Sequence, residues 1–198
     1  MRIKRHALLG MIAAVTLLAP LSYSQGGPVF KVTPVTSSIK FNVSASVPIA
    51  GNFDKWTATL KFPSADVTTG QLDIQISAAT VNTGSGMKND KLKSKDFFDV
   101  AQNPYITFKS TKVVQTGPTT FDVTGDFTIR GVSKPETLKV DISGKGTGHG
   151  TIKGTMAFDR KDYGMNSGIP FIKIADRVEV DIDLTADQVS GPKIQYKE

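Results

Sequence analysis

The sequence predicts an all-β protein, an eight-stranded antiparallel β-barrel with one short helix. Three observations support this fold class. Apolar and polar residues alternate along most of the chain, glycine- and proline-containing turns separate the alternating stretches, and no amphipathic helix is available to cover them. Because successive side chains of a strand point to opposite faces, each stretch presents one apolar and one polar face.

Eight stretches of the chain alternate in this way, and we expect each to form a strand. Such one-sided alternation is typical of antiparallel sheets, because parallel strands buried on both faces are continuously apolar. Turn signals lie between the strands, for example at Thr69-Gly70 and at residues 116–118. The alternating stretches are 39–45, 56–62, 72–78, 106–108, 121–129, 138–142, 152–158 and 178–184.

The length of the strands favours a barrel over a β-sandwich. Residues 37–46, 53–62, 119–130 and 177–188 can each form one strand that is longer than the usual five or six residues or so. Long strands suit a tall barrel, whose apolar faces cover one another around a common axis. A barrel of about eight strands is just wide enough to be filled by side chains or to hold one small ligand.

Two segments depart from the alternation. Residues 87–95 contain good helix formers and no β-branched residue, so we expect the short helix there. Residues 144–150 are rich in glycine but lack the Gly-Lys-Ser/Thr ending of a phosphate-binding loop, so we interpret them as a hairpin tip. We expect the ends of the mature chain, 25–28 and 190–198, to pack loosely.

The first 24 residues have the features of a secretory signal peptide. Arg2, Lys4 and Arg5 precede a short apolar run, 7–19, and small residues lie two apart at Ser22 and Ser24. The apolar run is too short to span a hydrocarbon core of about 30 Å. We therefore expect cleavage after Ser24, a single domain over 25–198, and no transmembrane segment in the mature chain.

Charge and cysteine content exclude several function classes. The net charge of +6 falls to +3 without residues 1–24, because these carry three of the 24 lysines and arginines and no acidic residue. The remaining charges are interspersed, which argues against nucleic-acid binding. The chain has no cysteine, so neither disulfides nor a lipidated N-terminal cysteine are expected.

The sequence offers little for catalysis. His149 is the one histidine outside the signal peptide, and no zinc, Gly-x-Ser-x-Gly or His-Glu-x-x-His pattern occurs. Paired carboxylates could act on a glycan, with Asp90, Asp96 or Asp162 as candidates, although aspartates at turns and helix caps are the more common case. We expect no enzyme, no catalytic residue, no metal and no cofactor.

Phe97 and Phe98 form an unusual pair of adjacent aromatic residues in a polar segment. Neighbouring residues of a strand face opposite sides, so both can join one core only if the chain turns there. They could plug one end of the barrel, form a wall over a ligand, or do both.

Several short motifs follow one another in a fixed order. They are TG at 83–84, NDKL at 89–92 with Ser94, DFFD at 96–99, NPYITFKS at 103–110, VTGDFTIRGVSK at 123–134 and DRKDYG at 159–164. Together these motifs resemble the YceI-like polyisoprenoid-binding family. The resemblance covers nearly all of residues 29–186, and it is the order of the motifs that is specific. The chain departs from the family at 89–92, where members often have Arg-Asp-x-His-Leu and this chain lacks the histidine.

The resemblance implies an extended lipocalin-like barrel, located in the periplasm, with a long isoprenoid or a similar amphiphile such as a fatty acid in its apolar core. We therefore predict a periplasmic lipid carrier with a long dry tunnel. A structural or adhesion barrel with a filled core is the alternative. The expected partner is a long-chain lipid, and the sequence is compatible with either a monomer or a homodimer. The predicted ligand-binding residues are Phe41, Trp56, Leu60, Ile74, Ile76, Phe97, Phe98, Phe108, Phe127, Met156, Phe158, Arg160, Val180 and Ile182.

Overall fold

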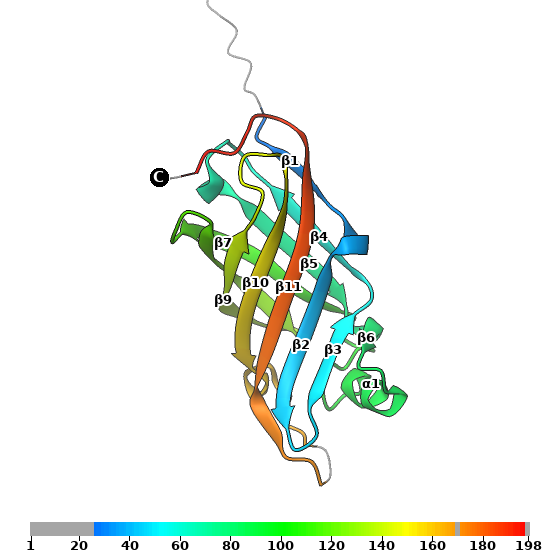
Figure 1. Ribbon diagram of the computed structural model, residues 1–198. Coiled ribbons are helices and arrows are strands. Elements are labelled where there is room, and N and C mark those ends of the chain that lie inside the picture. Colours follow the sequence, from blue (N-terminus) through cyan, green and yellow to red (C-terminus); the bar gives the residue numbers. More distant parts are fainter. Residues whose placement is uncertain (1–25, 169–170, 197–198) are drawn as a thin grey trace, which may run out of the picture.

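The computed structural model describes residues 26–168 and 171–196, and most of them lie in β-strands (Figure 1). The signal peptide predicted for residues 1–24 lies outside the described residues. The strands are β1 (Val29–Val32), β2 (Ser38–Ala45), β3 (Ile49–Phe53), β4 (Trp56–Lys61), β5 (Gln71–Ser77), β6 (Val81–Asn82), β7 (Tyr105–Gln115), β8 (Thr120–Ile129), β9 (Val132–Ile142), β10 (His149–Asp159) and β11 (Ile174–Ser190). The helix α1 spans Gly86–Lys93, and short 3-10 turns are η1 (Pro34–Thr36), η2 (Val67–Thr69), η3 (Ala78–Thr80) and η4 (Arg160–Tyr163).

Eight of these strands close into an antiparallel barrel, which confirms the predicted fold class. Neighbouring strands in the ring are β1, β4, β5, β7, β8, β9, β10 and β11, and β11 pairs with β1 to complete the circle. The predicted helix is confirmed as well, since α1, Gly86–Lys93, overlaps most of the predicted segment 87–95. Figure 1 shows the strands inclined along a tall barrel with α1 near its lower end.

The long strand β11 connects two parts of the wall. Its second half pairs with β1, from Ala186 to Ser190, and its first half pairs with β2, from Ile174 to Asp183. The turn η1, which begins with Pro34, separates β1 from β2, and proline cannot donate a hydrogen bond to a sheet ladder. At the lower end, β2, β3 and β6 extend the sheet beyond β11.

One predicted strand is two strands in the structure. Residues 53–62 were expected to be continuous, but Phe53 ends β3 and Trp56 begins β4. The chain turns between them because Asp54 N–H donates to Thr80 O at 3.2 Å and Lys55 O accepts from Ser77 N–H at 2.9 Å. These bonds tie the turn to η3 rather than to a straight continuation of the strand.

The barrel wall is least tightly closed between β1 and β4. The two strands share a single paired position, Val29 with Lys61. Among the described strands, β1 and β4 are also the two without a fully buried residue. Because the two strands pair at only one position, the side chains of Trp56 and Leu60 on β4 are covered incompletely and are half-buried. Among the described residues, no helix is long and apolar enough to span a membrane.

Candidate functional site

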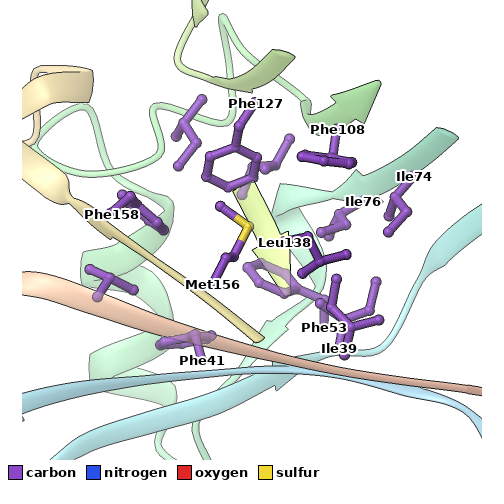
Figure 2. Packing of buried hydrophobic residues seen from close by; sticks show 14 of the residues in the cluster. Ile39, Phe41, Phe53, Ile74, Ile76, Phe108, Phe127, Leu138, Met156 and Phe158 are labelled. Atoms are coloured by element: carbon purple, nitrogen blue, oxygen red, sulfur yellow. The ribbon is translucent and has the colours of Figure 1, made fainter. Parts of the chain in front are cut away.

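The lower half of the barrel encloses an apolar cavity of about 80 Å³. Nearly all its walls are aliphatic or aromatic side chains from the inward faces of the strands, together with α1 and the segment that follows it. Figure 2 shows several of these side chains converging from opposite sides of the barrel. The lining residues are Ile39, Lys40, Phe41, Val43, Ile49, Phe53, Ile74, Ile76, Leu92, Phe97, Phe98, Ile106, Phe108, Phe127, Ile129, Met156, Phe158, Arg160, Met165, Ile174, Val178, Val180 and Ile182.

Phe97 and Phe98 both join this lower cavity, because the chain turns at their position. Phe98 N–H donates to Leu92 O at 2.9 Å, and Phe97 N–H donates to Ser94 O at 3.1 Å. Both side chains are buried. The Phe98 ring lies 5.9 Å from that of Phe53, within the range in which aromatic pairs attract. The adjacent phenylalanines therefore form part of the cavity wall beside α1.

Arg160 closes the lower end of the barrel with its buried guanidinium group. Its Nη1 donates to the carbonyl oxygens of Met165 and Ser167, Nε donates to Ala175 O at 3.3 Å, and Nη2 contacts Asp176 Oδ1 at 3.0 Å. Four of about five available N–H donors are thus used within the protein. Arg160 lines the cavity, but its hydrogen bonds hold the segment that leads into β11.

Tyr163 supports the same end from inside the barrel. Its ring is fully buried and packs edge-on against the rings of Phe158 at 5.2 Å and Phe127 at 5.6 Å. Its hydroxyl donates to Glu136 Oε1 at 3.1 Å. Burial, and then the neighbouring Glu136 carboxylate, raise the pKa of the Tyr163 phenol, so the group stays neutral as a donor.

A second apolar cavity, of about 120 Å³, occupies the upper half of the barrel. Its rim includes the glycine-rich hairpin and the C-terminal segment. The lining residues are Phe30, Leu60, Phe62, Val67, Gly70, Leu72, Val113, Phe121, Val123, Val140, Ile142, Ser143, Gly144, Gly146, Gly148, His149, Gly150, Thr151, Ile152, Ala186, Gln188, Lys193, Ile194 and Tyr196.

The C-terminal segment covers this upper cavity, so the prediction of a loosely packed end was wrong for residues 193–196. Gln195 N–H donates to Ala65 O at 2.7 Å, and Gln195 O accepts from Val67 N–H at 3.0 Å. The Tyr196 ring packs 6.3 Å from that of Phe121, with Lys145 Nζ 4.6 Å above it. The sequence contained one indication of this packing, because the apolar residues Ile194 and Tyr196 lie two apart in an otherwise polar C-terminal segment.

Leu138 and Leu184 separate the two cavities. Their side chains are 1% and 0% exposed, and neither lines a cavity. The two cavities share no lining residue. The predicted continuous tunnel is therefore wrong for this structure, because in-facing leucines fill the middle of the barrel. We call this region, defined by Leu138 and Leu184, the waist. Figure 2 shows Leu138 among other buried hydrophobic residues of the core.

Comparisons with known proteins agree with this architecture. The YceI-like domain is recognised over residues 30–186. The chain belongs to the YceI-like family. A UPF0312 protein of Pseudomonas syringae pv. tomato is 32% identical over 146 residues, which are 71% of this chain and 73% of that protein. A UPF0312 protein of Shewanella denitrificans is 28% identical over 169 residues, covering 82% and 88% of the two chains.

Solved structures share the fold of this YceI-like chain. Burkholderia cenocepacia BcnA aligns with a TM-score of 0.71 at 28% identity, covering 78% of this chain and 99% of that chain. A Saccharophagus degradans domain, described as a polyisoprenoid binding domain implicated in plant cell wall breakdown, aligns with a TM-score of 0.65 at 17% identity. It covers 81% of this chain and 99% of its own, and at this identity it shows the fold alone.

Several YceI-like motifs have structural roles around α1. In the NDKL stretch, Asn89 Oδ1 accepts hydrogen bonds from the backbone N–H of Thr83 at 2.9 Å and from its hydroxyl at 2.7 Å. Lys91 Nζ contacts Asp96 Oδ2 at 2.5 Å. Together these contacts hold the helix and the DFFD turn against the lower cavity.

Two of the three carboxylates considered for catalysis, Asp96 and Asp162, are engaged in ion pairs. Lys91 lowers the pKa of Asp96 by hydrogen bonding and by its charge, whereas a general acid needs a raised pKa. Asp162 lies 3.0 Å from Lys134 Nζ and is half exposed. These environments are typical of surface ion pairs and support a binding protein over a glycan-acting enzyme.

Most predicted site residues of this YceI-like barrel surround the lower cavity. Leu60 lines the upper cavity, and Trp56 faces a surface cleft of about 640 Å³ beside η1. The predictions missed lower-cavity residues that follow the same alternation, among them Val43 and Val178. They also missed Phe53, because its strand was not recognised. Those that line the lower cavity are Phe41, Ile74, Ile76, Phe97, Phe98, Phe108, Phe127, Met156, Phe158, Arg160, Val180 and Ile182.

Proposed function

We propose that this YceI-like protein is a carrier that holds the apolar tail of a long-chain isoprenoid or similar amphiphilic lipid inside its barrel. The observation that carries this proposal is the pair of apolar cavities, which lie within one closed wall and are lined by aliphatic and aromatic side chains. Apolar cavities of this kind stay dry and accept apolar ligands. The described binding property of the Saccharophagus degradans domain, which has the same fold, supports the same ligand class.

The volumes indicate how a tail would be accommodated. Cavities of about 80 and 120 Å³ are comparable to one that binds benzene, at about 150 Å³. A typical ligand pocket is larger, about 300–1,000 Å³. A long tail therefore occupies both cavities only if side chains at the waist move. The lower cavity is also lined by Met156 and Met165, whose flexible side chains adapt to an irregular ligand.

Energetics allow such a rearrangement. Forcing a packed core to accept extra volume costs about 1–3 kcal/mol. Burial of each methylene group contributes about 0.8 kcal/mol, so about two to four methylenes offset that cost. A tail with many more carbons gains net affinity from apolar contact, and no charged partner for its head group is required.

A structural barrel without a ligand is the second candidate function. The filled waist favours it, because fully buried Leu138 and Leu184 are what a barrel with a packed core would show. Under this alternative the two cavities would be packing defects, and the mature protein would carry no lipid after purification.

Lipid analysis of the purified protein distinguishes these functions. The full chain is expressed with its own N-terminal segment, purified without detergent, extracted with organic solvent and analysed by mass spectrometry. A stoichiometric lipid supports the carrier. The delipidated protein is then titrated with farnesol, with isothermal titration calorimetry as the readout. Absence of both a bound lipid and farnesol binding would support the structural barrel.

We further propose that the carrier acts in the bacterial periplasm, which the basic and apolar pattern of residues 1–24 supports. Osmotic-shock fractionation and N-terminal sequencing of the exported product test this location. The expected mature N-terminus is Gln25. An uncleaved chain that stays with the cytoplasmic fraction would contradict the proposal.

A further inference from the structure

Three exposed apolar side chains lie at the lower end of the barrel. Phe171 is fully exposed, Met87 is 84% exposed and Val47 is 49% exposed. They come from three segments far apart in the sequence: the chain before β11, the start of α1, and the β2–β3 turn. Figure 1 shows these three segments together at the lower end of the molecule.

Hydrogen bonds join the three segments into one surface. Lys88 Nζ donates to Pro48 O at 3.4 Å and connects α1 to the β2–β3 turn. On the other side of the turn, Ser46 N–H donates to Lys173 O at 3.0 Å, and Lys173 N–H donates to Ser46 Oγ at 3.2 Å. These bonds connect the three segments that carry the exposed apolar residues.

The backbone presents Phe171 outward. Its φ of 63° lies in the left-handed region, which is uncommon for a bulky non-glycine residue. Such a conformation has a cost and is often found at functional positions. The fully exposed ring of Phe171 is therefore available to insert into an apolar partner.

The same three segments form the lower end of the lower cavity. Ile49 follows the β2–β3 turn, Leu92 belongs to α1, and Ile174 begins β11, and all three line the cavity. The segments that carry the exposed apolar residues therefore also contribute side chains to the wall of the lower cavity.

Lysines border the exposed apolar side chains at this end. Lys88 follows Met87 on α1, and Lys173 lies two residues after Phe171. Among the described residues, neither Lys88 nor Lys173 forms an ion pair. Exposed apolar side chains flanked by lysines are the combination that binds the surface of an anionic bilayer.

A second copy of the chain fits this surface less well. Three side chains supply a few hundred Å² or so of apolar area, below the roughly 800 Å² that each partner of a stable complex buries. A two-fold contact would also bring Lys88 and Lys173 of one copy toward the same lysines of the other. The charge pattern thus favours a membrane over self-association.

We propose that this lower end, defined by Val47, Met87, Lys88, Phe171 and Lys173, is a docking surface for an anionic lipid bilayer. The proposal rests on the carrier function, since docking here places the lower cavity against the membrane from which a lipid would be taken or to which it would be delivered. Phe171 and Met87 insert between the lipids, and the lysines contact the anionic head groups.

Vesicle sedimentation tests the proposal with the mature protein. Vesicles of phosphatidylcholine alone are compared with vesicles that also contain phosphatidylglycerol. Wild type should sediment with the anionic vesicles, and Phe171→Ser should weaken this binding about tenfold, because a phenylalanine side chain no longer inserts. The double variant Lys88→Gln/Lys173→Gln should remove the preference for anionic vesicles. Val35→Ser is the matched control, because Val35 is 93% exposed on η1, away from this end.

The outcomes separate this proposal from the carrier function. Failure of wild type to bind anionic vesicles, or equal losses for Phe171→Ser and Val35→Ser, would overturn the docking surface. If Phe171→Ser instead shifts a dimer to a monomer in size-exclusion chromatography, a second copy is the partner. Farnesol binding in solution should be unchanged in Phe171→Ser. If wild type does not bind farnesol, the carrier function is contradicted, whereas binding to anionic vesicles would still support the docking surface.

Discussion

The side chain of Leu138 lies against the backbone of Gly154 in the middle of the barrel. A Cβ atom at position 154 would lie 3.1 Å from Cγ, Cδ1 and Cδ2 of Leu138. Gly154 occupies an inward position of β10, between Ile152 and Met156. Because Gly154 has no side chain, Leu138 can pack against the backbone of β10. In this position Leu138 separates the two cavities.

Leu138→Ala should join the two cavities and allow longer lipids to bind. We expect the free energy of unfolding to fall by about 2–5 kcal/mol, as for other large-to-small changes in a core. We also expect geranylgeraniol, which has the longer tail, to gain affinity relative to farnesol. Urea unfolding measures the loss of stability, and isothermal titration calorimetry with the two alcohols measures the change in preference.

Val81→Ala is the control for this variant. Val81 is buried in β6 and lines neither cavity. It should lose stability without changing the preference for tail length. If both variants change that preference equally, Leu138 is not the barrier between the cavities.

Alanine at two inward glycines should have unequal effects. Gly154→Ala meets only the end of a flexible leucine, so we expect a loss of about 1–3 kcal/mol and a folded protein. At Gly125, a Cβ would lie 2.5 Å from Lys109 O and 2.7 Å from Phe108 Cζ, and a backbone atom cannot move away easily. Gly125→Ala should therefore be more destabilising in thermal melts. The reverse order would contradict this account of the waist.

The alternation of residues was enough to predict the barrel and most of its lower cavity. Side chains such as Phe41 and Ile74 alternate with polar neighbours, and this period of two fixes the face on which they lie. The resemblance to the YceI-like family then suggested the ligand class that is proposed for the two cavities. The pattern identifies which residues point inward, and the structure agrees with it for nearly every strand.

The division of the interior could not be predicted from the same pattern. Alternation treats Leu138 as one more inward residue and Gly154 as a gap, but their contact depends on strand register and on how far a side chain reaches across the barrel. Arg160 is a similar case. The DRKDYG motif indicated a functional position for Arg160. Its hydrogen-bond partners are instead set by the path of the chain into β11, and they are Met165, Ser167, Ala175 and Asp176.

Arg160→Met should destabilise the protein much more than Arg177→Met. Arg160 is buried and holds three backbone carbonyls and Asp176, so its loss leaves these acceptors without donors. We expect at least about 2 kcal/mol, since hydrogen bonds to charged groups contribute about 1.5–3 kcal/mol each. Arg177 is largely exposed and pairs with Glu179 at 3.4 Å, and such pairs contribute little. Similar melting temperatures for the two variants would contradict a structural role for Arg160.

The ion pairs of Asp176 should make stability depend on pH in the acidic range. Lys161 at 2.7 Å, and then Arg160 at 3.0 Å, lower the pKa of the Asp176 carboxyl from its ordinary value of 3.8. Because the folded pKa is the lower one, the stabilisation is complete above pH 3.8 and is lost as the pH falls through the folded pKa. Asp176→Asn removes the group that titrates.

The comparison of wild type with Asp176→Asn from neutral pH to about pH 2.5 measures this contribution. Wild type should be the more stable protein at neutral pH, and the difference in melting temperature should shrink below pH 3.8. Salt should reduce the difference at neutral pH as well, since Asp176 and Lys161 are partly exposed. A difference that stays constant down to the lowest pH would mean that Asp176 acts through its hydrogen bonds and not through its charge.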